Sequence, residues 1–462
     1  MKITEKGYII ILSIVAIILA GFLAFHFYGG NQEVEPALPA NPANPADPAN
    51  PSDPANPDDP SDPSVIFDWP RIDKDVEQVV NANNQFAFDL YSELSKNTEG
   101  NIFYSPYSIS TALAMTYEGA KGQTADEIKS VFHFPENEIL RKNNAAIYGE
   151  LNRVNSDYEL KTANALWAQY DYNFLDDYIS RVEKYYGGKV VNLDFRNETE
   201  KSRQTINAFI EEKTNNRIKD LIPAGFLNPI TKLVLTNAIY FKGTWKWEFD
   251  KANTSERDFY ITSTNSVKTP MMSMDPEKAK FNYADLGKMQ ILELPYKGEN
   301  ISMLILLPKQ EEEYDFETEK VIVSNFTLAD IDLSATKLGE YKKEMHESKL
   351  DWISLPKFEF DTKYFMGDTL SAMGMPTAFG NGADFSGMDG KKNLQISEVI
   401  HQAFVKVDEV GTEAAAATAV IMKEVAVMDQ NIFKADHPFI FIIQENETGN
   451  ILFIGRVTDP TK

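Results

Sequence analysis

Residues 409–429 read EVGTEAAAATAVIMKEVAVMD, an alanine-rich stretch that follows one strand-like segment and precedes two more. Alanine is the strongest helix former, so one interpretation is a helix. The alternation of side chains supports another, because the even positions from 412 to 422 are small or apolar, whereas Glu413 and Lys423 fall on odd positions. A strand that enters a core by its even face needs this pattern. Composition supports equally a helix and a segment that switches from loop to strand.

Gly411 stands near the start of this stretch. We expect it to act as a backbone pivot, because glycine adopts backbone angles that other residues cannot. The small side chains that follow would let the segment slip between neighbouring strands with little steric resistance. The part of the chain that begins at Gly411 is therefore the part best suited to change its structure.

Helical patterns dominate the first half of residues 67–462. Apolar side chains recur at helical spacing at Val76, Val79, Val80, Phe88 and Tyr91. Ser105 followed by Pro106 is typical of a helix start, and the segment after it carries a single charge, so this second helix should be buried on nearly all sides. Thr124 and Glu127 match a T-x-x-E capping box, which predicts that a third helix starts at Thr124.

Strand patterns dominate the second half. Six apolar segments read as strands, at residues 232–243, 289–296, 301–308, 403–410, 439–444 and 451–457. A series of helices followed by a series of strands predicts an α+β fold in which helices pack on large antiparallel sheets.

The N-terminal region has a different character. Residues 8–28 are almost continuously apolar, and lysines precede the run. About 20 helical residues span the hydrocarbon core of a membrane. The charge distribution predicts a cytoplasmic tail over residues 1–7, a transmembrane signal anchor over residues 8–28, and an extracellular remainder. The alternative is a cleaved signal peptide, which would make the protein secreted, although no A-x-A site follows the run.

Residues 29–66 form a proline-rich segment in which proline recurs at every third position from Pro36 to Pro63. Polyproline II has three residues per turn, so these prolines would line one edge of an extended rod. At ~3.1 Å per residue the repeat would reach roughly 90 Å. The alternative is a merely disordered linker. Both interpretations make it a spacer between the membrane and a globular domain over residues 67–462.

Composition excludes several classes of function. The chain has 462 residues, a formal net charge of −24 and no cysteine. The acidic balance argues against a nucleic-acid partner, and the lack of cysteine excludes disulfides and thiolate chemistry. The five histidines show no pair at metal-binding spacing, and no nucleophile elbow, zinc motif or phosphate loop is present. We therefore expect no cofactor, no metal and no enzymatic activity.

Several long motifs, taken in order, resemble the serpin family across nearly the whole globular part. They are NIFYSPYSISTALAMTYEGAKGQTADEI at 101–128, LTNAIYFKGTWKWEF at 235–249, LPKFEF at 355–360, ADFSGM at 383–388, ISEVIHQAFVKVDEVGTEAAAATAV at 396–420, ADHPFIFII at 435–443 and TGNILFIGRV at 448–457. The resemblance implies one domain of three β-sheets and eight to nine helices, with an exposed reactive-centre loop.

The resemblance also implies a mechanism. In this family a protease attacks the reactive loop as bait and forms an acyl-enzyme, and the cut loop then inserts as a new strand in the central sheet. Insertion drags the protease across the molecule, so that hydrolysis stalls in a kinetic trap. The partner would be an extracellular serine protease and the inhibitor a monomer. The alternative is a non-inhibitory member that acts as a binding or chaperone-like protein.

The hinge of the loop matches the pattern of inhibitory members. Its residues are Glu409, Gly411, Thr412, Glu413, Ala414, Ala415, Ala416, Ala417 and Thr418. Counting along the loop places the scissile bond between Val425 and Ala426, which suits elastase- or subtilisin-like proteases. Cleavage after Lys423 by a trypsin-like protease, or after Glu424 by a glutamyl-specific one, is the alternative.

Two further sets match family positions. Ser105, Ser108, Asn237 and His401 resemble the "shutter", a polar cluster beneath the sheet that must open. Trp245 resembles the tryptophan of the "breach", where the hinge first enters the sheet. The alternative for all five residues is ordinary core packing.

Overall fold

The computed structural model describes residues 70–152, 157–275, 279–309, 312–315, 320–323, 327–412 and 431–462, without the side chains of 310–326. The expected tail, anchor and linker over residues 1–66 lie outside the described residues. Within the described ranges no helix is long and apolar enough to cross a membrane.

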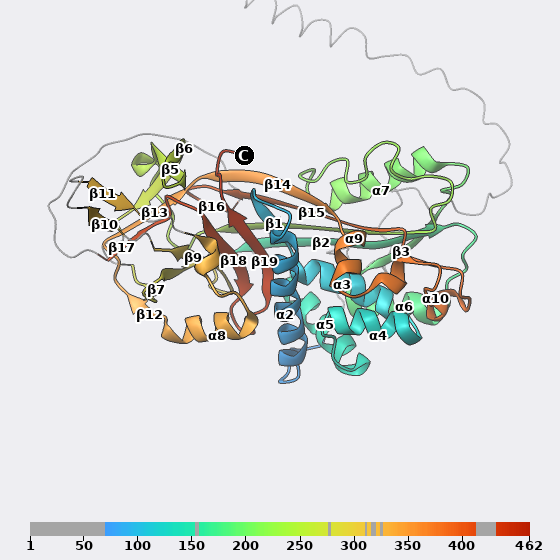
Figure 1. Ribbon diagram of the computed structural model, residues 1–462. Helices are drawn as coiled ribbons and strands as arrows, with labels where there is room; N and C mark the ends of the chain where they lie inside the picture. The colour runs from blue at the N-terminus through green and yellow to red at the C-terminus, as the bar shows by residue number, and fades with distance from the viewer. Residues whose placement is uncertain are drawn as a thin grey trace, which may run out of the picture. The chain divides into compact units, whose positions relative to one another are not determined.

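Nine α-helices and three short 3-10 helices occur in the described part of the chain (Figure 1). The α-helices are α2 (Val76–Ser95), α3 (Pro106–Tyr117), α4 (Gly122–Val131), α5 (Asn137–Leu151), α6 (Asp176–Tyr186), α7 (Thr199–Lys213), α8 (Ala335–Glu344), α9 (Gly367–Met373) and α10 (Ser386–Asp389). The 3-10 helices are η1 (Lys251–Asn253), η2 (Leu328–Asp330) and η3 (Pro376–Phe379).

Of the three predicted helices, the apolar face of the first and the start of the second agree with the structure, whereas the start of the third does not. The five apolar residues expected on one face of α2 are all buried. Ser105 caps α3 by accepting a hydrogen bond from the Ser108 amide, and all twelve residues of this helix are buried. The capping box was wrong, because α4 begins at Gly122 and the side chains of Thr124 and Glu127 instead accept hydrogen bonds from a distant loop, residues 377–384.

The sheet that contains Gly411 and Thr412 has six strands. Their order is β14 (Phe358–Phe365), β15 (Glu398–Val407), β16 (Gly411–Thr412), β4 (Leu233–Thr244), β2 (Tyr158–Gln169) and β3 (Lys189–Leu193). Helix α7 covers one face of this sheet and α3 lies against the other (Figure 1). The middle of the sheet is therefore enclosed on both faces.

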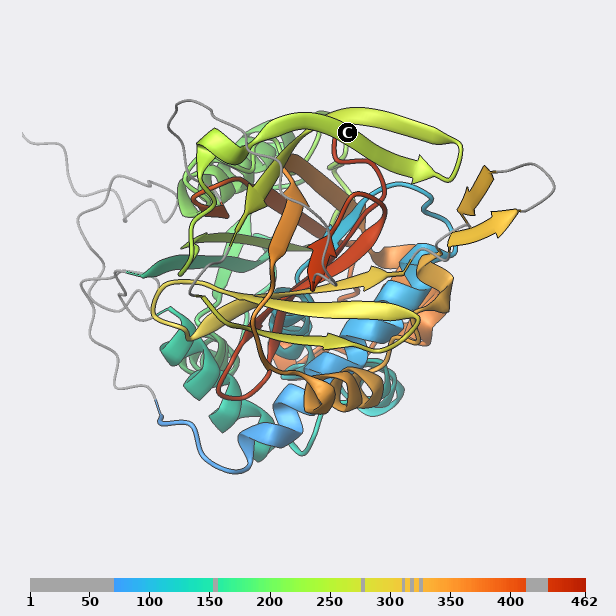
Figure 2. The ribbon, with the colours of Figure 1, turned by 90° about the vertical axis from the view of Figure 1, so that its left-hand side faces the viewer.

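Two other large sheets and a two-stranded ribbon complete the described strands. The seven-stranded sheet has the order β1 (Ile102–Tyr104), β19 (Ile451–Val457), β18 (Phe439–Glu445), β9 (Ile301–Pro308), β8 (Met289–Pro295), β7 (Phe281–Asp285) and β12 (His346–Ser348). The four-stranded sheet has the order β17 (Ile432–Lys434), β13 (Trp352–Pro356), β6 (Asn265–Met274) and β5 (Ser255–Thr262). Figure 2 shows β5 and β6, in yellow-green, at the top of the view. The ribbon pairs β10 (Glu312–Asp315) with β11 (Lys320–Val323).

All six expected strand segments coincide with strands, but the sheets are not purely antiparallel. Strand β15 is parallel to β4, β2 to β3, and β13 to β17. Strand β15 also ends at Val407, three residues before the end of the expected segment. Alternation within one strand carries no information about the direction of its neighbour, so the sequence could not reveal the parallel pairs.

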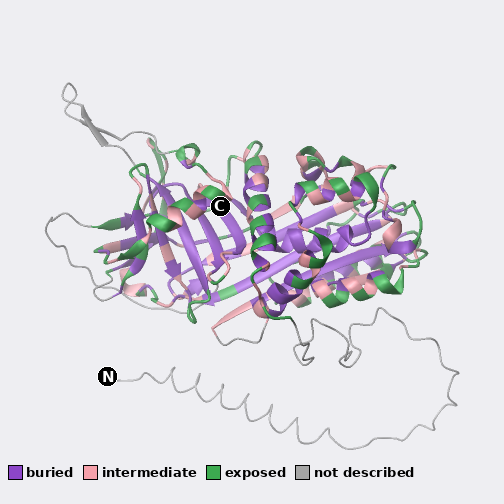
Figure 3. Ribbon diagram, turned by 90° about the horizontal axis from the view of Figure 1, so that it is seen from below, coloured by how far each residue is buried: buried purple, intermediate pink, exposed green. Residues whose placement is uncertain are grey.

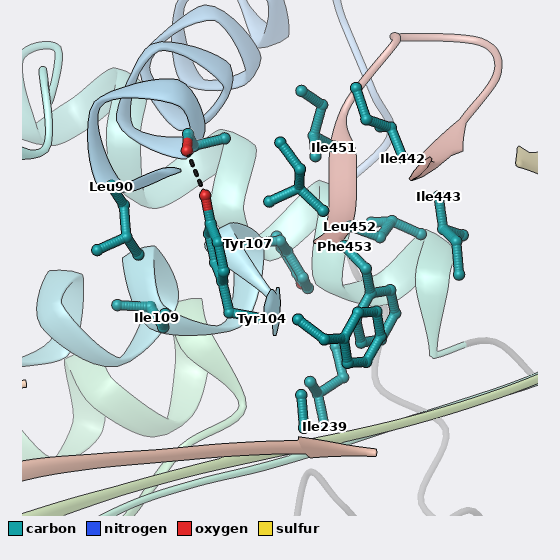
Figure 4. Close-up of a cluster of buried hydrophobic side chains, with 14 of the residues drawn as sticks. Leu90, Tyr104, Tyr107, Ile109, Ile239, Ile442, Ile443, Ile451, Leu452 and Phe453 are labelled. Carbon is teal, nitrogen blue, oxygen red and sulfur yellow. Dashed lines mark hydrogen bonds between the residues drawn. The ribbon is translucent and has the colours of Figure 1, made fainter. Parts of the chain in front are cut away.

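The main core lies between the six-stranded and seven-stranded sheets and the helices α2 and α3. Most residues of the central strands are buried (Figure 3). Figure 4 shows part of this core, where the Tyr104 hydroxyl donates to the Ala87 carbonyl and Phe453 lies near Ile239. The Phe103 ring stacks on that of Phe453, with 5.2 Å between centroids. This packing fixes α3 and the seven-stranded sheet beneath the six-stranded one.

Candidate functional site

The candidate site begins where β16 enters the six-stranded sheet. Thr412 pairs with Val407 of β15 on one side and with Gly243 of β4 on the other. Further along, β15 and β4 pair directly, from Glu398 with Val234 to Ala403 with Ile239. The first two residues of the expected strand thus lie between β15 and β4 at one end, and the sheet is closed beyond them.

Gly411 is required here for a reason other than the one expected. Its φ is not positive, so it does not use the backbone freedom peculiar to glycine. Instead, a Cβ atom at this position would lie 2.0 Å from the carbonyl oxygen of Gly243. Glycine is needed here because only glycine lets the two backbones come this near, and its role as a pivot stays a prediction.

Trp245 lies under the chain that leads into β16. Its indole N–H donates to the Asp408 carbonyl at 3.0 Å, and its amide donates to the Val410 carbonyl at 2.8 Å. The Asp408 carboxylate in turn accepts hydrogen bonds from the amides of Val410 and Gly411. These bonds hold residues 408–411 in a tight turn that directs the chain back into the sheet.

Tyr296, which directly follows β8, completes the entrance. Its ring stacks on Trp245, with centroids 4.5 Å apart, and its hydroxyl shares a hydrogen bond with that of Thr412, with 2.6 Å between the oxygens. Burial raises the pKa of the Tyr296 hydroxyl well above its ordinary value. The group therefore stays protonated, and both hydroxyls are inside the protein.

Glu409 anchors the turn from the other side. Its carboxylate accepts hydrogen bonds from the Lys357 ammonium and the Thr254 hydroxyl, both at 2.8 Å, and its carbonyl accepts one from the Phe249 amide. Burial opposes the charge of Glu409, but the bonds to Lys357 and Thr254 leave the pKa of Glu409 lowered. The carboxylate is therefore charged at neutral pH and fixed in place.

The four residues of the expected shutter lie together beneath the closed part of the sheet. The Ser105 amide donates to His401 Nε2 at 3.1 Å, and His401 Nδ1 lies 2.5 Å from Asn237 Oδ1. The Asn237 amide group donates to Ser108 Oγ and to Asn164 Oδ1. Because Asn164, Asn237 and His401 are register partners, the cluster crosses three neighbouring strands, β2, β4 and β15.

These bonds determine the protonation of His401. Its Nε2 accepts a hydrogen bond, so the single proton of the neutral ring is on Nδ1 and points to Asn237. Burial lowers the pKa of His401 from 6.5 to about 3, against the opposing effect of its bond to Asn237. A neutral histidine therefore links β15 to β4 at physiological pH.

The remaining predicted site residues, Glu413–Thr418 and the scissile pair Val425 and Ala426, lie outside the described residues. Three further residues that contact the predicted site residues were not predicted from the sequence: Asn164, Tyr296 and Lys357. Asn164 sits on the inward face of a strand, and a buried asparagine at such a position is a weak signal. Tyr296 and Lys357 meet the hinge only through the tertiary fold, and no local pattern indicates them.

The model of the serpin family, described as serine protease inhibitors, matches residues 81–460. The chain is a serpin. An uncharacterized serpin-like protein of Methanosarcina acetivorans is 44% identical over 393 residues, covering 83% of this chain and 88% of the relative. The leukocyte elastase inhibitor of Homo sapiens is 39% identical over 391 residues, covering 83% and 100%.

Solved structures confirm the serpin fold. Uncleaved ovalbumin is 30% identical and superposes with a TM-score of 0.71, covering 82% of this chain and all of its own. Thyroxine-binding globulin in complex with thyroxine is 31% identical, also with a TM-score of 0.71, covering 83% and 99%. The expected α+β class with three β-sheets and eight to nine helices is thus confirmed. Serpins are mostly protease inhibitors rather than enzymes.

The neutral state of His401 predicts a specific pH dependence of stability. The unfolded chain binds a proton at this histidine below about pH 6.5, whereas the folded chain does so only near pH 3. The contribution of neutral His401 to the free energy of unfolding is therefore complete above pH 6.5 and is lost as the pH falls toward 3. Between these values the free energy of unfolding should fall by up to about 1.4 kcal/mol per pH unit because of this group.

The measurement is urea unfolding of the full chain at several pH values, compared with His401→Gln. The variant is expected to be less stable at pH 7 but to lose less stability on acidification. Parallel curves for the two proteins would show that His401 is not held neutral.

Proposed function

We propose that this serpin is an irreversible, suicide-type inhibitor of serine proteases. The observation that carries the proposal is the position of β16, with its first residues already between β15 and β4. Beyond that point β15 pairs directly with β4, and one further strand could be inserted between them if these two strands separated. The chain itself would contribute bait and movement but no catalytic group.

The register of β16 can be extended into the sheet. Antiparallel partners run in opposite directions, so six residues beyond Thr412 correspond to six residues before Val407 on β15 and before Gly243 on β4. Thr418 would therefore come between His401 and Asn237, the two residues that share the shutter hydrogen bond. A strand ending at Ile421 would replace every direct pair between β15 and β4.

The two faces of such a strand fit their surroundings. Thr412 points inward to Tyr296, so the even positions, which are small or apolar, would also face the core. The odd position Glu413 would face outward between Lys406 and Lys242, one on each neighbouring strand. Opposite charges across strands stabilise a sheet. These matches support a strand over the helix that composition alone allows.

The proposed reaction follows the chemistry of a serine protease up to its first product. The protease's serine oxygen attacks the carbonyl carbon before the scissile bond, the C–N bond breaks, and the nitrogen leaves as a new protonated amino terminus. An ester then joins the protease to this chain. Insertion of residues 413–421 would lengthen β16 by roughly 30 Å and carry the ester along the sheet before water attacks it. Distortion of the protease then keeps the ester from hydrolysis.

The target is proposed from the expected scissile bond. Val425 before the cut suits a protease with a small apolar pocket, such as an elastase- or subtilisin-like enzyme. The relationship to the leukocyte elastase inhibitor supports this class. Cleavage after Lys423 or Glu424 would indicate a different protease.

We further propose that residues 8–28 anchor the chain in the membrane and that residues 29–66 hold the serpin domain outside the cell. The support is the apolar run, the lysines before it and the proline repeat after it. A monomeric state stays a prediction.

The inhibitor proposal predicts a covalent complex. Incubation of the full chain with an elastase- or subtilisin-type protease should give a band near the summed mass that survives SDS. Mass spectrometry of the released C-terminal fragment should show that it begins at Ala426. Cleavage in the loop with no such band, and with no rise in the melting temperature of the cleaved chain, would instead indicate a non-inhibitory serpin.

The face assignment predicts different effects at neighbouring positions. Ala414→Glu would put a carboxylate opposite Val405 and Phe241, which are buried in the core, and burying an unpaired charge costs several kcal/mol. Ala415→Glu would put it on the opposite face, between buried Tyr240 and half-buried Phe404, where the Arg217 guanidinium over the Phe404 ring could pair with it. The yield of SDS-resistant complex should fall about ten-fold or more for Ala414→Glu and clearly less for Ala415→Glu. Equal losses would contradict the proposed register.

The anchor predicts a membrane-bound protein. Expressed in a bacterial host, the full chain should sediment with membranes and resist extraction by high salt, whereas a chain lacking residues 1–28 should stay in the supernatant. An N-terminus found after Tyr28 in the mature protein would show that the segment is a cleaved signal peptide.

A further inference from the structure

The entrance to the sheet is built around a single inward hydroxyl. Thr412 is 2% exposed and Tyr296 is fully buried, and their hydroxyls bond only to each other among the contacts of the described residues. A buried hydroxyl that loses its partner costs about 1–3 kcal/mol. The Tyr296 hydroxyl is therefore satisfied by one loop residue in one position.

The surroundings leave Tyr296 little freedom to follow the loop. Its ring is stacked on that of Trp245 and meets the Phe241 ring edge-on, with centroids 4.5 Å and 5.1 Å away. A Cβ atom on Gly243 would lie 2.7 Å from the same ring, so the ring fills the space under β4. Its amide donates to the Ile301 carbonyl, which ties the residue to the start of β9 in the seven-stranded sheet. The hydroxyl is thus a fixed point.

The neighbours of Thr412 cannot replace it at this point. A shift of one residue in one direction would bring Gly411, which has no hydroxyl, and a shift in the other would bring the carboxylate of Glu413 under β4. A one-residue shift also turns every later side chain to the opposite face of the sheet. The even face would then lie outside and the charged odd face inside.

We propose that Tyr296 is a positioning residue that sets the register of loop insertion by holding the Thr412 hydroxyl. The inference rests on the proposed inhibitory function and adds to it the residue that decides which face of the loop enters the core. Without this bond the first inserted residues lose their alignment, insertion is delayed, and the protease completes hydrolysis more often. Loss of this bond should therefore change mainly the ratio of hydrolysed to trapped protease reactions, and the stability of the folded chain to a smaller degree.

The test compares the full chain with Tyr296→Phe, Thr412→Val and the double variant. The probe is an elastase- or subtilisin-type protease that the unchanged protein traps, and the readout is the ratio of cleaved chain to SDS-resistant complex. Loss of one hydrogen bond should raise this ratio about five-fold in each single variant. The double variant should show the same rise, because both changes remove one interaction. Thr412→Ser, which keeps the hydroxyl, should behave like the unchanged protein.

Tyr178→Phe is the matched control, because the Tyr178 hydroxyl is equally buried and donates to the Met115 carbonyl at 3.0 Å, in the helical region. It should lower the melting temperature as Tyr296→Phe does and leave the ratio unchanged. Equal ratios for the two tyrosine variants, or additive effects in the double variant, would overturn the inference. If Tyr296→Phe does not fold, Thr412→Val and Thr412→Ser decide the question. Failure of the unchanged protein to trap any protease would instead overturn the proposed function itself.

Discussion

The direct ladder between β15 and β4 is the constraint on which the rest of the molecule depends. It closes the six-stranded sheet over six register pairs and leaves it open toward the end where Gly411 and Thr412 enter. Two parallel strands joined in this way satisfy their backbone groups without a third strand. A strand from the loop could add its own hydrogen bonds on both sides, so the closed sheet holds less pairing than the chain is able to form.

The polar cluster beneath the ladder links its two strands by side chains as well. Neutral His401 on β15 and Asn237 on β4 are joined at the level where Thr418 would arrive. Buried polar groups of this kind favour one arrangement strongly and can exchange partners without being left unsatisfied. At the entrance, Trp245, Glu409 and Tyr296 fix the turn that leads into β16. The polar cluster and the entrance residues therefore lie at two different levels of the same boundary between β15 and β4.

Much of this could be predicted from the sequence. The apolar face of α2, the Ser105 cap and nearly complete burial of α3, the six strand segments and the inward direction of Thr412 follow from local periodicity and from residue type. The start of α4, the parallel pairing of β15 with β4 and the contacts of Tyr296 and Lys357 do not, because each depends on residues far apart in the chain. Gly411 was predicted to be a pivot, whereas its close approach to the backbone of β4 is visible only in the structure.

The position of Tyr296 outside the six-stranded sheet has a consequence for how such loops vary. Tyr296 belongs to the segment between β8 and β9, and this segment is hydrogen-bonded to the end of β4, so the residue would be a reference point that keeps its place relative to β4. The register of an inserted strand would then start at Thr412. An insertion or deletion between Thr412 and Ile421 would therefore move Thr418 away from its position between His401 and Asn237. Residues after Ile421 would not be subject to this constraint on length. If the proposed register holds, related chains could lengthen, shorten or change the loop beyond that point, and so acquire new target proteases, without altering the residues that direct its insertion.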